Sequence, residues 1–174
     1  MSEEANLNND SIYHKQILKS NISIFPKDLT SNNIDEILKQ KIIELKEGIC
    51  VREGFIRRGS INIISRSAGK VNSGSFKGDI IYIVEYEAEI CNPQQRQIIS
   101  CNVLSSNKAS INAYVEDKDL SPLEIVMHRQ HHIGNSEFVM LKENDKILIE
   151  VIYTKYKYLD KKIHIVSKFI KLDN

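Results

Sequence analysis

The run His128-Arg129-Gln130-His131-His132 concentrates imidazole and guanidinium groups in one short segment. Imidazole is a common zinc ligand, but a zinc site needs three or four ligands that converge on one point. The remaining candidate ligands are widely spaced cysteines without a C-x-x-C pair, namely Cys50, Cys91 and Cys101. The run therefore favours a polar connection in which His128 and Arg129 contact phosphate, and we expect no metal or other cofactor.

A second cluster mixes positive charge with aromatic rings. Lys155-Tyr156-Lys157-Tyr158 is followed by Lys161-Lys162 near a predicted turn between two strands. Lysines neutralise phosphates and tyrosines stack on bases of any sequence, so Lys155, Tyr156 and Lys157 are candidate contacts for single-stranded RNA. The alternative is a solvated hairpin tip whose tyrosines only cover the end of a barrel.

Catalytic patterns are not evident. The sequence contains no Gly-rich phosphate loop before a helix, no nucleophile elbow and no H-E-x-x-H pattern. Glu85, Glu87 and Glu89 alternate along one strand, as solvated charges do on an open sheet, and are a candidate surface for a basic partner. These patterns indicate a binding protein and not an enzyme.

Bulk properties limit the class of protein. The 174 residues can form one ordinary domain or two small ones. Because the 24 basic residues are nearly balanced by 23 acidic ones, nucleic-acid binding would need a local basic patch.

The sequence shows no sign of a membrane or export segment. No apolar run approaches the roughly 20 residues that span a bilayer, and the acidic start Met1-Ser2-Glu3-Glu4 is unlike a signal peptide. We expect an intracellular protein with reduced, buried cysteines. The abundant Ile, Lys and Asn indicate an AT-rich genome, which would suit a large DNA virus or an AT-rich eukaryote.

The elements that must position these residues fall into two segments. Residues 1–11 are polar and predict a mobile tail. Between residues 12 and 92, alternation predicts a strand from Ile17 to Ile24, and helical spacing predicts a helix from Asn33 to Glu47 that Gly48 ends in a left-handed conformation. Further strands are predicted at Phe55–Ile56, Ser60–Ile64 and Ile80–Ile90, with a loop at residues 65–77. The result would be a helix packed on one face of a small sheet.

The segment Asn92-Pro93-Gln94-Gln95-Arg96 predicts the domain boundary, because Pro93 interrupts strand pairing. Residues 93–174 then contain five strand candidates, with a long connection between the third and the fourth. They are Ile98–Leu104, Ile111–Val115, Leu123–Met127, Ile147–Tyr153 and Ile163–Ile170. This pattern predicts a five-stranded OB barrel, so the fold class is mixed α+β and all-β.

One family resemblance covers roughly Ile17 to Leu172. It depends on Glu47, Gly48, Cys50, Gly54 and Ile56 after the predicted helix and on Val84, Tyr86, Ala88 and Pro93 at the domain junction. In this order these residues resemble the stalk subunit of archaeal and eukaryotic RNA polymerases, the family of the seventh subunit of RNA polymerase II and its archaeal counterpart. The resemblance implies an N-terminal ribonucleoprotein-like domain followed by an RNA-binding OB barrel.

The resemblance also implies a function. Such a subunit is non-catalytic and docks its N-terminal domain at the base of the polymerase clamp, while its barrel contacts emerging RNA. Its partners would be the large polymerase subunits, a smaller helical stalk subunit and single-stranded RNA, in the nucleus or, for a viral enzyme, in the host cytoplasm or the virion. The loop Arg66 to Lys77 would be the docking tip, with Arg66, Lys70 and Lys77 facing acidic residues and Gly48 and Gly54 shaping the backbone.

The chain departs from the family pattern in the second barrel strand, where a glycine and an aromatic residue are common. Here the sequence is Lys108-Ala109-Ser110-Ile111, which leaves Lys108 and Tyr114 as the candidate RNA contacts on that face. Binding should then be modest and independent of sequence. Two alternatives stay open: a free-standing single-stranded nucleic-acid-binding OB protein, and an assembly scaffold that binds no nucleic acid.

Overall fold

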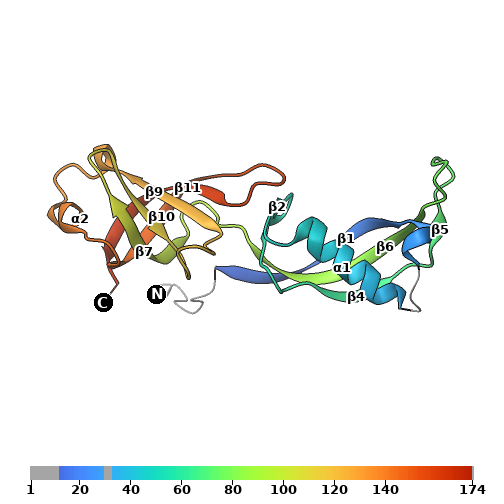
Figure 1. Ribbon diagram of the computed structural model, residues 1–174. Helices are drawn as coiled ribbons and strands as arrows, with labels where there is room; N and C mark the ends of the chain where they lie inside the picture. The colour runs from blue at the N-terminus through green and yellow to red at the C-terminus, as the bar shows by residue number, and fades with distance from the viewer. Residues whose placement is uncertain (1–11, 30–32, 174) are drawn as a thin grey trace, which may run out of the picture. The chain divides into compact units, whose positions relative to one another are not determined.

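The protein is built mainly of β-strands. The computed structural model describes residues 12–29 and 33–173 (Figure 1). The chain divides into two compact units, one over Tyr13–Cys91 and one that includes residues 92–173. The predicted tail at residues 1–11 lies outside the described residues.

The first unit is organised around one long strand, β6 (Ile80–Cys91). Along one edge β6 pairs antiparallel with β1 (Tyr13–Ile24) over the full length of both strands. Its other edge pairs with three shorter strands in succession: β3 (Gly54–Ile56), β4 (Asn62–Arg66) and β5 (Lys70–Val71). A further short strand, β2 (Cys50–Val51), pairs with β3.

The helix α1 (Ile34–Lys46) contributes to the core of this unit. Its Leu38 and Ile42 are completely buried in a cluster with the inward side chains of β1 and β6. Burial of each such side chain contributes about 1.5–3 kcal/mol. The helix ends near the predicted position, and Gly48 has the predicted left-handed backbone, with φ of 72°. That this unit is a ribonucleoprotein-like domain stays a prediction.

Several predicted boundaries in the first unit were wrong. Strand β1 begins at Tyr13, before the predicted Ile17. The segment predicted as a loop, residues 65–77, contains the end of β4 and all of β5. Two-residue strands such as β2 and β5 show no alternation of their own, and they form because β3 and β6 offer unpaired edges.

The second unit is a closed five-stranded barrel, as predicted. Neighbouring strands follow the order β7, β8, β9, β11, β10 and back to β7, with β9 and β11 parallel and the other pairs antiparallel. The strands are β7 (Ile98–Ser106), β8 (Ser110–Tyr114), β9 (Leu123–His128), β10 (Lys146–Lys155) and β11 (Ile163–Leu172). Each contains a strand predicted from alternation, apart from differences at the ends.

Alternate side chains of each barrel strand fill the interior. Cys101 is one of them, and burial raises the pKa of its thiol to about 12. All three cysteines are buried, as expected, and their reduced state stays a prediction. The connection from β9 to β10 holds a 3-10 helix, η2 (Arg129–His131), and a short helix, α2 (Ser136–Met140), capped by the side chain of Asn135. In the described part of the chain, no helix combines the length and apolar character that crossing a membrane requires.

Candidate functional site

The predicted RNA contacts lie at two opposite ends of the barrel. Ser110 pairs with His128, so the turn between β7 and β8 lies beside the end of β9. Strand β11 starts with Ile163 next to Leu123, the first residue of β9. The β10–β11 hairpin is therefore at the other end of β9. The structure brings Lys108 together with His128 and Arg129, but it separates them from Lys155, Tyr156 and Lys157.

Arg129 stabilises the turn that contains Lys108 through hydrogen bonds. Its Nε donates to the carbonyl oxygen of Asn107 at 2.6 Å and its Nη2 donates to Ser106 Oγ at 2.7 Å. Its backbone N–H also donates to Ala109 at 3.0 Å. The guanidinium is thus already hydrogen-bonded within the barrel, while Lys108 is exposed. Arg129 positions the turn, and Lys108 is the more accessible cation.

His132 has a structural role that the sequence did not reveal. Its Nδ1 hydrogen-bonds the carbonyl oxygen of His128 at 2.8 Å, and its Nε2 accepts from the backbone N–H of Phe169 at 2.9 Å. The ring stacks on Phe138 with 4.0 Å between centroids, and burial lowers its pKa below the ordinary value. A neutral imidazole satisfies both hydrogen bonds. Within the described residues, no three His, Cys, Asp or Glu side chains come together to hold a metal ion.

The hairpin between β10 and β11 ends in an ordered turn. The backbone N–H of Lys157 donates to Asp160 Oδ2 at 2.6 Å, and that of Asp160 returns to the carbonyl oxygen of Lys157 at 3.1 Å. The exposed Leu159 has a left-handed backbone, with φ of 74°. Lys155 and Lys157 are exposed, whereas Tyr156 is half-buried. The lysines are accessible to phosphate, and Tyr156 is less well placed for stacking.

Strand register defines a continuous outer surface that we call the outer band. One row crosses four strands through Asn112, Val126, Val166 and Tyr153, and the next row runs through Glu124, His164 and Lys155, with Tyr114 at the end of β8. In that second row His164 Nδ1 lies 2.7 Å from Glu124 Oε2. The band thus joins two tyrosines and a lysine on one face.

Tyr153 is the residue of the outer band that sequence reasoning missed. Strict alternation from Ile147, Ile149 and Val151 would point position 153 into the barrel. A register shift between Val151 and Tyr153 turns the ring outward, where it is 57% exposed. A bulge in β10 is invisible to a pattern of alternating residues, so only the strand pairing identifies this ring.

The predicted docking residues of the first unit differ in their availability. Arg66 forms an ion pair with Asp35 of α1, and its guanidinium lies 5.8 Å from the centre of the Tyr82 ring. Lys70 and Lys77 are exposed. Of the three predicted cations, Lys70 and Lys77 are therefore the two best placed to meet a partner.

Gly48 and Gly54 have backbone roles. Gly48 donates its N–H to the carbonyl oxygen of Ile56 at 2.9 Å, and Gly54 opens β3 with φ of 140°. Both φ values lie in the region that side chains with a Cβ disfavour. These glycines shape the chain between α1 and β3, and any contact with a partner stays a prediction.

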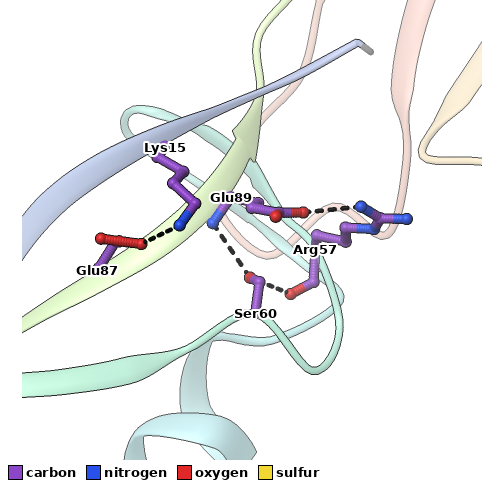
Figure 2. A network of polar contacts seen from close by, with 5 residues as sticks. All are labelled: Lys15, Arg57, Ser60, Glu87 and Glu89. Atoms are coloured by element: carbon purple, nitrogen blue, oxygen red, sulfur yellow. Dashed lines mark hydrogen bonds and ion pairs between the residues drawn. The ribbon is translucent and has the colours of Figure 1, made fainter.

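The acidic ladder on β6 is neutralised within the chain (Figure 2). Lys15 Nζ lies 2.8 Å from Glu87, Arg57 Nη1 lies 2.7 Å from Glu89, and Ser60 Oγ accepts from the backbone N–H of Glu89 at 3.2 Å. The third carboxylate, Glu85, is 3.4 Å from Lys19. The face presents ion pairs instead of free carboxylates, which weakens the hypothesis of an acidic surface for a basic partner.

Comparison with known proteins gives one relationship that spans both units. No protein-family model matches the chain. The chain is 22% identical over 169 residues to a protein of Acanthamoeba polyphaga mimivirus named "Putative DNA-directed RNA polymerase subunit". The aligned region covers 93% of this chain and 84% of that protein. The similarity therefore extends through the strand-rich first unit and the barrel alike.

Proposed function

We propose that the chain is a non-catalytic stalk subunit of a multisubunit DNA-directed RNA polymerase. The first unit docks on the large subunits at the base of the clamp, a helical stalk partner binds alongside, and the barrel contacts emerging RNA. The site of action is intracellular, in the nucleus or, for a viral enzyme, in the host cytoplasm or the virion. The observation that carries the proposal is the similarity, over 93% of the chain, to a mimivirus protein named as a putative DNA-directed RNA polymerase subunit. The stalk position is the finer part of the proposal.

Two structural features support the finer assignment. The barrel has five strands in which the third and fifth are parallel and the long connection precedes the fourth, which is compatible with an OB fold. Its outer band carries Tyr114, Tyr153 and Lys155, the residue types that stack bases and neutralise phosphates. The net charge of +1 favours weak RNA binding, which would suffice if the polymerase holds the transcript near the barrel.

The polymerase assignment is tested by affinity purification of the tagged full chain from the cells in which it is made. Recovery of the two largest polymerase subunits is the expected result. The variant Lys70→Glu/Lys77→Glu should recover less of them, whereas Arg66 is left unchanged because its replacement would break the pair with Asp35. Recovery of nucleic acid without polymerase would favour a free-standing binding protein. Recovery of neither would favour a scaffold.

RNA contact is tested by fluorescence anisotropy with a labelled single-stranded RNA of mixed sequence. If lysines contact phosphates, log affinity should fall with log salt by roughly 0.7 per phosphate neutralised. Tyr153→Ala should cost about 1–3 kcal/mol if a base stacks on this ring. Lys155→Glu/Lys157→Glu should weaken binding, while Lys27→Glu/Lys39→Glu, with the same charge change at exposed positions of the other unit, should not. Equal affinities in all four proteins would remove RNA contact from the outer band.

A further inference from the structure

The loop between β5 and β6, residues Asn72–Asp79, is held in one shape by its own hydrogen bonds. The backbone N–H of Asn72 donates to Asp79 at 2.9 Å, and that of Ser75 donates to Asn72 at 3.1 Å. The Asn72 side chain accepts from the N–H of Gly74 at 3.2 Å, and Ser75 Oγ accepts from the N–H of Lys77 at 3.2 Å. We call this segment the β5–β6 loop. It presents its tip residues in a fixed arrangement.

Asp79 anchors the β5–β6 loop to the sheet. Its Oδ2 accepts from Ser23 Oγ of β1 at 2.9 Å and from Asn72 Nδ2 at 3.1 Å. The carboxylate is buried, and hydrogen bonds from Ser75 and Asn72 lower its pKa to about 2. It therefore stays ionised at neutral pH and fixes both ends of the loop against the longest strand pair of the unit.

The tip of this anchored loop carries an aromatic side chain that touches almost nothing in the chain. Phe76 has a relative exposure of 111%, the highest among the exposed large apolar residues of the described chain, and Val71 at the base of the loop is 62% exposed. An isolated exposed apolar residue is ordinary on a protein surface. Here, however, the exposed ring is combined with a loop that several hydrogen bonds hold rigid, and rigid aromatic anchors dominate many protein interfaces.

We propose that Phe76 is the anchor by which the first unit binds another protein, inserting into an apolar pocket whose rim carries carboxylates. The exposed Lys70 of β5 and Lys77 of the loop supply the charges that such a rim would attract, whereas Arg66 is already paired with Asp35. Two cations and one ring offer little to a phosphate backbone or to a lipid surface, which need several charges or a larger apolar area. The inference rests on the proposed function for the identity of the partner, a polymerase core subunit.

The test measures the affinity of the full chain for purified core polymerase that lacks this subunit. Phe76→Ala should raise the Kd by about 30-fold or more, as for a central aromatic anchor. Phe76→Leu should recover part of the affinity because it restores apolar volume. Ile133→Ala, at an 88% exposed position of the other unit, is the matched control and should bind like the unchanged protein. Circular dichroism should give the same folded state for all four proteins, since neither Phe76 nor Ile133 packs in the core.

The outcomes separate the two proposals. If the unchanged chain binds core polymerase and Phe76→Ala binds equally well, the anchor is wrong and the polymerase assignment stands. If the unchanged chain does not bind core polymerase, both proposals fail. Binding to single-stranded RNA, or to vesicles of phosphatidylcholine and phosphatidylserine, that Phe76→Ala abolishes would also overturn the assignment of a protein pocket.

Discussion

The Nε2 of His132 accepts a hydrogen bond from the backbone N–H of Phe169 at 2.9 Å. This contact ties the connection between β9 and β10 to β11, at a point where β9 has already ended. The other ring nitrogen bonds the carbonyl oxygen of His128 at 2.8 Å. Only a neutral ring can accept from Phe169 while donating to His128. Protonation of this imidazole would therefore break the hydrogen bond that links the β9–β10 connection to β11.

This relationship predicts a pH dependence of barrel stability. Burial lowers the pKa of His132 below its ordinary value of 6.5, with His131 and Lys168 acting in the same direction and the His128 carbonyl opposing. A lowered pKa means that the stabilisation is complete above about pH 6.5 and is lost as the pH falls through the folded-state pKa. Thermal midpoints measured from about pH 8 to about pH 5 should show this decline.

The variant His132→Phe keeps a ring against Phe138 but leaves the N–H of Phe169 without its acceptor. Its free energy of unfolding at pH 8 should be lower by about 1–3 kcal/mol, and the decline below pH 6.5 should become shallower. His14→Gln, at an exposed position of the other unit, is the control and should retain the decline. A decline of the same size in His132→Phe would assign it to other groups.

Gly69 and Gly74 should respond differently to the same added methyl group. A Cβ at Gly69 would lie 2.7 Å from Ile80 Cγ2 and from the Tyr82 ring, whereas at Gly74 the nearest atom is Asn72 Oδ1 at 3.5 Å. Gly69→Ala should therefore destabilise the first unit by about 1–3 kcal/mol. Gly74→Ala should be neutral or slightly stabilising. Urea unfolding measures both, and equal values would mean that Ile80 and Tyr82 move aside freely.

Gly48→Val should lower the free energy of unfolding by about 1–2 kcal/mol, because a residue with a Cβ is disfavoured at its φ of 72°. Gly59→Val is the matched variant, with φ of 74° and no atom within 4 Å of its Cβ position. At Gly48 the added atom would also meet Arg58 Nε at 2.5 Å. The two thermal melts should both show a loss, with Gly48→Val at least as severe. An unchanged melt for both would contradict the role of the left-handed backbone.

Asp79 should make the first unit sensitive to strong acid. Hydrogen bonds from Ser75, Asn72 and Ser23 lower its pKa from 3.8 to about 2. Its contribution to stability is therefore complete above about pH 4 and lost as the pH falls through about 2. Circular dichroism of the unchanged protein and of Asp79→Asn during acid titration measures this. The variant should lose less stability across that range, and identical profiles would contradict the prediction.

Periodicity was sufficient for the long elements and failed for the short ones. The strands of the barrel and α1 each bury one face, so their apolar residues recur at the spacing that the element imposes. Strands β2 and β5 have two residues each and exist because of the edges of β3 and β6. No local pattern encodes such pairing, because the partner lies elsewhere in the chain.

For the candidate site, the sequence predicted which residue types could contact a partner, but it did not predict which of these side chains are already engaged in contacts within the chain. Arg66 and Arg129 have the charge expected of contact residues, yet Asp35 and the turn at Ser106 and Asn107 use their guanidinium groups. His132 lies in a polar run but is buried against Phe138. Whether each of these side chains is accessible to a partner depends on contacts with residues distant in sequence or on a bulge. Such tertiary contacts cannot be read from composition.

The arrangement of the first unit around β6 has a consequence for how the chain folds during synthesis. Tyr13 pairs with Cys91, and every other strand of the sheet except β2 also pairs directly with β6, the last strand of the unit. Contacts between residues so distant in sequence form slowly, since closing the loop precedes any gain from pairing. During synthesis on the ribosome, the apolar faces of β1 and α1 therefore stay exposed until β6 has emerged and can pair with β1. Apolar surface that stays exposed during synthesis favours aggregation, so the order in which the strands emerge makes folding of the first unit sensitive to the rate of translation.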